Sequence, residues 1–149
     1  MPQVNTILPS FDGVPLWRNG PAPADSDLAG KPLLVHFFSS GCPLCREGMP
    51  AVRRLHATFA PAGLVVVGAY QPQPDTKPTT ADAERECDLH VGPTHACALD
   101  VEGVLSARFG NEWAPAYYVY DRGHRLRHYQ MGNWNLDAIA AIIEGCMKV

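Results

Sequence analysis

The sequence lacks long hydrophobic runs and blocks of charge of one sign. Its longest apolar stretches, such as Leu33–Val35 and Leu64–Val67, are far shorter than the roughly 20 residues that a membrane-spanning helix needs. Lysine and arginine number 12 against 15 acidic residues, for a formal net charge of -3. This balance gives no electrostatic reason to expect binding to nucleic acid or to an anionic membrane. We therefore expect no membrane span and no nucleic-acid partner.

Cysteine is also scarce, and the first residues show no pattern typical of a secretory signal. Five cysteines are too few for a disulfide scaffold in 149 residues, and the odd number leaves at least one thiol unpaired. The first residues lack the charged and apolar regions of a secretory signal, so the sequence as given indicates a cytoplasmic protein. A sequence shortened at its start would look the same, which leaves an extracytoplasmic location open. The length suits one domain over residues 1–149, and we expect a monomer.

The apolar pattern predicts alternating strands and helices. Residues 1–32 are rich in proline and carry turn signals at Asp12-Gly13 and Asn19-Gly20, which favours a looped N-terminal extension with room for one hairpin. Strands are expected at 33–38, 64–70, 96–99, 116–120 and 126–129. Helices are expected from 45 to before 61, at 81–89, at 104–109, and after Asn135 as N-cap. This order predicts an α/β fold with a central mixed sheet covered by helices on both faces.

The motif Cys42-Pro43-Leu44-Cys45 stands where the first predicted strand gives way to a helix. Two cysteines three apart at a helix start face the same side, close enough to form a disulfide. The positive end of the helix favours the thiolate, which is the species that attacks disulfides. Cys42 is thus the expected nucleophile and Cys45 the resolving thiol, and such a pair needs no cofactor. Pro43 suits the first helical position.

The segment from Gly30 to Pro50 resembles the active-site segment of thioredoxin-like proteins of the TlpA/ResA type. In that family Gly-Lys-Pro precedes the strand, as at residues 30–32, and a proline falls five residues after the second cysteine. The similarity continues through residues 109–123 and covers about residues 26–147. It implies a thioredoxin-like fold and a thiol–disulfide oxidoreductase that acts on protein thiols and disulfides, with a thiol protein as electron donor.

The resemblance also assigns roles to residues distant from the motif. By similarity Pro115 is the family's cis-proline, which leaves the backbone of Ala114 free to hold an extended substrate segment. Pro50 corresponds to the kink in the active-site helix. Trp113 lies two residues before Pro115 and either borders the active site or simply packs.

The chain departs from the family pattern at three positions. Gly41 stands where thioredoxin has a tryptophan, which should open the surface beside Cys42. His36 stands where thioredoxin has a buried aspartate, and Gly48 where ResA-type proteins have an acidic residue. His36 is either the base that deprotonates Cys45 or a hydrogen-bonded core histidine. We count Gly41, Pro43, Leu44, Trp113 and Ala114 as substrate-binding candidates.

Two other functions stay open at this point. Ser39 lies three residues before Cys42, a spacing that peroxiredoxins use, which makes peroxide reduction an alternative. Cys42 and Cys45 are also soft ligands, so a thiol-based metal-binding protein is the other. Between oxidant and reductant, the Pro-Leu dipeptide offers no cation to stabilise the thiolate strongly, which favours a reductant of moderate potential.

The other three cysteines do not point to a single role. Cys87 and Cys97 bracket His90 and His95, a pattern that fits a metal site, a second redox pair or two unrelated thiols. Cys146 lies on the apolar side of the last predicted helix and is expected in the core.

Overall fold

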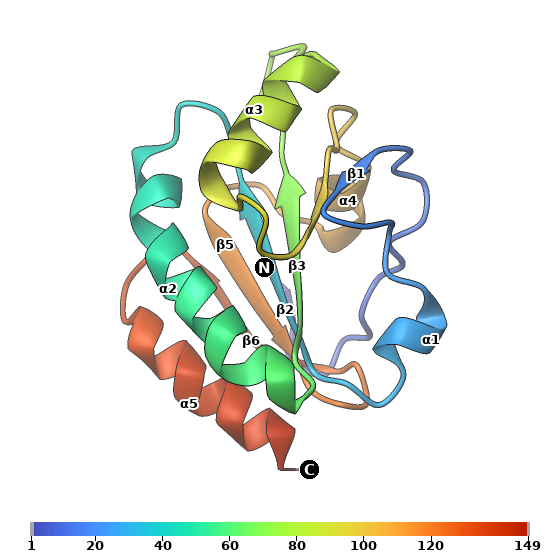
Figure 1. Cartoon of the computed structure of the whole chain (residues 1–149), viewed down its shortest axis with the longest axis vertical. Helices are drawn as coiled ribbons and strands as arrows, with labels where there is room; N and C mark the ends of the chain where they lie inside the picture. Colours follow the sequence, from blue (N-terminus) through green and yellow to red (C-terminus); the bar gives the residue numbers. More distant parts are fainter. Residues whose placement is uncertain (1, 149) are drawn as a thin grey trace.

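The computed structural model describes residues 2–148 and contains one six-stranded sheet in the order β1-β4-β3-β2-β5-β6 (Figure 1). Parallel pairing joins β2 to β3 and β3 to β4, whereas β1, β5 and β6 pair antiparallel with their neighbours. The predicted mixed sheet is thus confirmed. The strands are β1 (Trp17–Arg18), β2 (Leu33–Phe38), β3 (Val65–Tyr70), β4 (Ala96–Ala98), β5 (Ala116–Tyr120) and β6 (Leu126–Met131).

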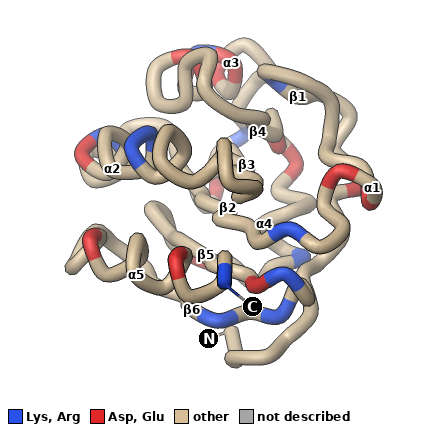
Figure 2. The backbone as a smooth tube through the Cα atoms, turned by 60° about the horizontal axis from the view of Figure 1, so that its bottom comes forward, with Lys and Arg blue, Asp and Glu red and all other residues tan. Residues whose placement is uncertain are grey.

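Helices cover both faces of the sheet, as predicted. Figure 2 shows α2, α3 and α5 on one face and α1 and α4 on the other. Side chains alternate along β2, so that Leu34 packs under α2 while Leu33 packs toward α1 and α4. Among residues 2–148, none of the helices has the length and apolarity that a bilayer span requires. The helices are α1 (Asp25–Leu28), α2 (Pro43–Phe59), α3 (Thr80–His90), α4 (Val104–Phe109) and α5 (Leu136–Met147), with a 3-10 turn at Ala60–Ala62.

The N-terminal extension forms no hairpin within residues 2–32, so that expectation was wrong. The Asn19-Gly20 turn is followed by Pro21 and Pro23, which lack the N–H donors that a second strand would need. Instead β1 pairs with β4, and the Asn19 side chain donates hydrogen bonds to the carbonyls of Gly92 (2.6 Å) and His95 (2.9 Å). The extension also runs beside β6, where the Leu126 N–H donates to the Thr6 carbonyl at 2.9 Å.

Helix ends differ slightly from the predicted bounds. α2 begins at Pro43, two residues before the predicted start, because Cys42 serves as its N-cap. α5 has Asn135 at its N-cap position, as expected, but the Asn135 side chain makes no capping hydrogen bond and its backbone is left-handed, with φ 50°. Pro50 lies inside α2.

Candidate active site

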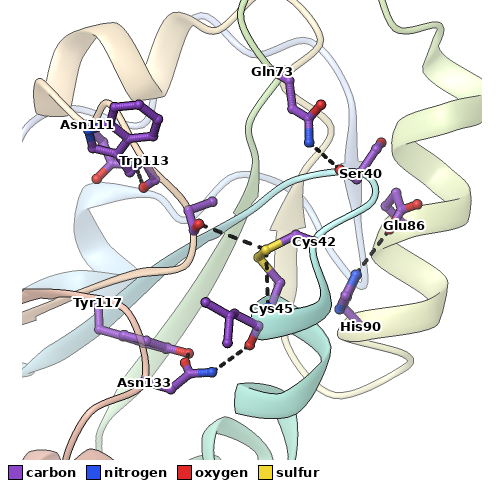
Figure 3. The surroundings of a disulfide bond; sticks show 12 residues. Ser40, Cys42, Cys45, Gln73, Glu86, His90, Asn111, Trp113, Tyr117 and Asn133 are labelled. Atoms are coloured by element: carbon purple, nitrogen blue, oxygen red, sulfur yellow. Dashed lines mark hydrogen bonds and ion pairs between the residues drawn. A yellow bond between two sulfur atoms is a disulfide. The ribbon is translucent and has the colours of Figure 1, made fainter.

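Cys42 and Cys45 form a disulfide at the N-terminus of α2, with their Cα atoms 5.2 Å apart (Figure 3). The Cys45 N–H is shared between two acceptors of Cys42, the backbone carbonyl oxygen at 3.1 Å and the sulfur at 3.2 Å. Cys42 is half-buried, whereas only 2% of Cys45 is exposed. A partner can therefore reach Cys42 while the Cys45 sulfur stays shielded.

The loop before β5 lies against the cysteine pair. Its Ala114–Pro115 peptide bond is cis, and the Ala114 carbonyl oxygen lies 3.9 Å from the Cys42 sulfur. The fold thus brings together two segments 72 residues apart in the sequence. Pro115 itself is buried.

A pocket of about 390 Å³ opens beside Cys42, and the five residues named as substrate-binding candidates all line it. Gly41 has φ +63°, and a Cβ added there would meet nothing within 4 Å, so the surface next to Cys42 is open. Ser39 also lines the pocket. The full lining is Ser39, Gly41, Cys42, Pro43, Leu44, Gln71, Pro72, Gln73, Pro74, Glu112, Trp113 and Ala114.

A buried amide network supports the wall of this pocket. The Asn111 side chain donates to the Gln71 side-chain oxygen at 2.6 Å and to the Trp113 carbonyl at 2.9 Å. The Tyr118 hydroxyl donates to the Asn111 side-chain oxygen at 2.9 Å. Because a buried network with every partner in place is rigid, the loop that carries Trp113 is held in one position. Sequence reasoning missed these residues.

A second set of hydrogen bonds, also missed from the sequence, holds the first turn of α2. The Asn133 side chain donates to the Leu44 carbonyl at 2.7 Å and accepts from the Tyr117 hydroxyl at 2.8 Å (Figure 3). Burial raises the pKa of Tyr117 to about 12, so this hydroxyl stays a donor at neutral pH. A Cβ added at Gly48 would overlap the Tyr117 hydroxyl, which therefore fills the space beside the position where ResA-type proteins have an acidic residue.

Known proteins match this chain over most of its length. Residues 17–129 match the model of the AhpC/TSA family. The chain belongs to the AhpC/TSA family. It is 32% identical over 125 residues to the thiol-disulfide oxidoreductase YkuV of Bacillus subtilis, covering 84% of this chain and 83% of that protein. It is also 29% identical over 125 residues to the thiol:disulfide interchange protein DsbE of Pseudomonas aeruginosa, covering 84% of this chain and 64% of that protein.

Solved structures agree. A thioredoxin-like protein in its oxidised form superposes with a TM-score of 0.78 at 28% identity, covering 97% of this chain and 96% of that one. These matches confirm the TlpA/ResA-type resemblance, the thioredoxin-like fold and the assignment of this AhpC/TSA family member as a thiol–disulfide oxidoreductase. They do not favour the peroxide-reduction alternative.

In this AhpC/TSA family member His36 is a buried histidine whose hydrogen bond goes to another histidine. Its Nε2 atom lies 2.7 Å from the Nε2 atom of His95. Burial, with a further contribution from His90, lowers the pKa of His36 to about 3. Burial also lowers the pKa of His95 to about 2, together with the nearby His36, His56 and Arg53. This geometry favours the hydrogen-bonded core histidine over the base.

A buried hydrogen-bonded pair on α3 lies beside the disulfide (Figure 3). The Glu86 carboxylate lies 3.1 Å from the His90 imidazole, and Figure 3 shows the pair beside the first turn of α2. Burial lowers the pKa of His90 even though the Glu86 carboxylate acts in the opposite direction.

The three remaining cysteines are buried free thiols. Burial, followed by the contact with the Cys87 thiol, raises the pKa of Cys97 well above its usual range, so these two thiols are neighbours. The histidines between them bond elsewhere, His90 to Glu86 and His95 to His36. Within residues 2–148, no group of three or more His, Cys, Asp or Glu side chains is placed to hold a metal. Cys146, on α5, packs into the core.

Proposed function

We propose that this protein exchanges disulfides with other proteins, with Cys42 as the nucleophile and Cys45 as the resolving thiol. The unequal exposure of the two sulfurs at the N-terminus of α2 carries this proposal. Cys42 faces an open pocket and lies at the positive end of a 17-residue helix, whereas Cys45 is shielded beneath it. The helix end favours a thiolate at Cys42, its exposure leaves it accessible, and the shielding of Cys45 supports a resolving role for the second sulfur.

In the reducing direction the reaction has two steps. The Cys42 thiolate attacks a substrate disulfide, forms a bond to one substrate sulfur, and the other substrate sulfur leaves as a thiolate. The Cys45 thiolate then attacks the Cys42 sulfur, which closes the Cys42–Cys45 disulfide and releases the second substrate thiol. Two electrons pass from the dithiol to the substrate, and a thiol protein as donor restores the dithiol.

The reducing direction rests on what surrounds Cys42. The Cys45 N–H and the helix end stabilise its thiolate, and Pro43 and Leu44 add no positive charge. Modest stabilisation of the thiolate corresponds to a dithiol that gives up its electrons readily. Titration of the oxidised protein against glutathione measures the potential, and we expect a value more reducing than that of the glutathione pair. A more oxidising value would reverse the assigned direction.

A trapping experiment tests the roles of the two cysteines. The variant Cys45→Ser should hold a mixed disulfide on Cys42, because the resolving thiol is gone, and mass spectrometry of the adduct identifies the partner. Cys42→Ser should trap nothing under the same conditions. Cys87→Ser, which removes a buried thiol outside the motif, serves as the matched control and should behave as the unsubstituted protein. Trapping on Cys45 rather than Cys42 would contradict the assignment.

A further inference from the structure

A second pocket lies on the far side of Trp113 from the cysteine pair. Its volume is about 390 Å³, within the range of pockets that bind ligands. Glu112 and Trp113 line both this pocket and the pocket beside Cys42, so the two are continuous along one surface. The second pocket is lined by Pro2, Gly110, Glu112, Trp113, Tyr129, Gln130, Met131 and Trp134.

Exposed apolar side chains gather on the surface that joins the two pockets. Among the described residues, eight large hydrophobic side chains are exposed, and four of them line these pockets: Leu44, Trp113, Met131 and Trp134. Trp113 is 60% exposed and Trp134 is 63% exposed. Clustered exposed apolar side chains mark interaction sites, and tryptophans are frequent among the residues that dominate binding.

One charge lies in the middle of this surface. Among residues 2–148, Glu112 is the only charged residue in the lining of either pocket. Its side chain is exposed, and no ion pair within residues 2–148 involves it. A carboxylate between two apolar pockets favours a partner that carries a cation beside its apolar side chains.

The walls of the second pocket are fixed in place. The Gln130 side chain donates to the carbonyls of Gly132 (3.0 Å) and Trp134 (2.9 Å), which holds the turn that bears Trp134. Asn111 holds the opposite wall through the Trp113 carbonyl. A pocket whose walls are already ordered loses little conformational freedom when a partner binds.

We propose that the pocket beyond Trp113 is a second docking site for the partner polypeptide, which takes up one of its apolar side chains while Glu112 pairs with a lysine or arginine of the same segment. This proposal rests on the proposed function, because the segment reaches the pocket while its cysteine reacts at Cys42. An extended segment places alternate side chains on one face, so it can present its cysteine to one pocket and an apolar residue to the next.

The test uses synthetic peptides that each carry one cysteine in a disulfide with thionitrobenzoate, a coloured leaving thiol. In one series a Phe-Lys pair is moved from two to six residues before or after the cysteine. In two matched series Ser-Lys takes its place, which removes only the apolar side chain, and Phe-Glu takes its place, which reverses only the charge. The disulfide of mercaptoethanol with the same leaving thiol is the short substrate, which cannot reach past Trp113. The second-order rate constant for release of the coloured thiol in a single turnover of the reduced protein is measured for each, and expressed as the ratio of the peptide value to the short-substrate value.

We expect this ratio to rise about tenfold at one Phe-Lys position, and Trp134→Ala to abolish the rise. Glu112→Lys should reverse the preference for lysine over glutamate, which an exposed ion pair sets at about two- to fivefold. Leu89→Ala removes an exposed apolar side chain outside both pockets and should leave every ratio unchanged. If the ratio does not change with the position of the Phe-Lys pair, the proposed docking site is wrong. Failure to react with the short substrate would instead overturn the proposed function.

Discussion

The buried pair of His36 and His95 should make the protein sensitive to mild acid. Each imidazole is neutral in the folded chain, because burial lowers the pKa of His36 to about 3 and that of His95 to about 2. In the unfolded chain both return to an ordinary pKa near 6.5. Below pH 6.5 the unfolded chain therefore binds protons that the folded chain does not bind. The free energy of unfolding keeps its full histidine contribution above pH 6.5 and declines as the pH falls toward the pKa values of the folded chain.

The size of the effect follows from these pKa values. For one histidine with this shift, the free energy of unfolding falls by about 2 kcal/mol between pH 7 and pH 5. The two histidines together give a decline of at most about 4 kcal/mol, since they are hydrogen-bonded to each other and do not titrate independently. This is a large part of the 5–15 kcal/mol of stability that is typical of single domains.

Urea unfolding of the oxidised protein at pH 7, 6 and 5, followed by circular dichroism, measures the decline. A double variant, His36→Leu with His95→Leu, replaces both partners of the buried hydrogen bond by apolar groups and should lose most of the pH dependence. His128→Gln, on β6, is the matched control and should keep it. If the double variant declines as steeply as the unsubstituted protein between pH 7 and pH 5, the histidine pair is not the cause and the reasoning fails.

Two further predictions concern the packing around the site. Gly48→Ala should lower the free energy of unfolding by about 1–3 kcal/mol, because the new Cβ overlaps the buried Tyr117 hydroxyl; a variant as stable as the unsubstituted chain in urea would show that the tyrosine moves aside freely. Tyr118→Phe should cost about 1–3 kcal/mol by the same measurement, because it removes the donor to the buried Asn111 side-chain oxygen, and Tyr129→Phe, on the neighbouring strand, should cost less.

The sequence pattern predicts most of the elements because their signals are local. The apolar run of β2 and the cysteine motif at the start of α2 lie within about ten residues of each other, and both can be read without knowing what packs against them. The same holds for α4 and β5, whose observed bounds equal the predicted ones. The two-residue β1 and the single-turn α1 were missed because elements so short carry no periodicity.

The supports of the active site could not be predicted, because each joins residues distant in the sequence. Asn133 bonds to a carbonyl 89 residues earlier, and Asn111 to a side chain 40 residues earlier. The same limit explains why His36 was considered as a base for Cys45, since nothing near it in the sequence indicates that His95 lies against it. The five substrate-binding candidates came instead from the motif and the family resemblance, and the structure places all of them on one pocket.

The N-terminal extension protects both edges of the sheet. It contributes β1 at one edge of the sheet, beside β4. At the other edge, residues 5–8 form backbone hydrogen bonds at the start of β6. An exposed edge strand has unpaired backbone N–H and C=O groups that can pair with a strand from another molecule, and proteins counter this by keeping such edges short or covered. One pass of the chain's own N-terminus over both edges therefore shortens the places where an extended segment of another molecule could add itself to the sheet.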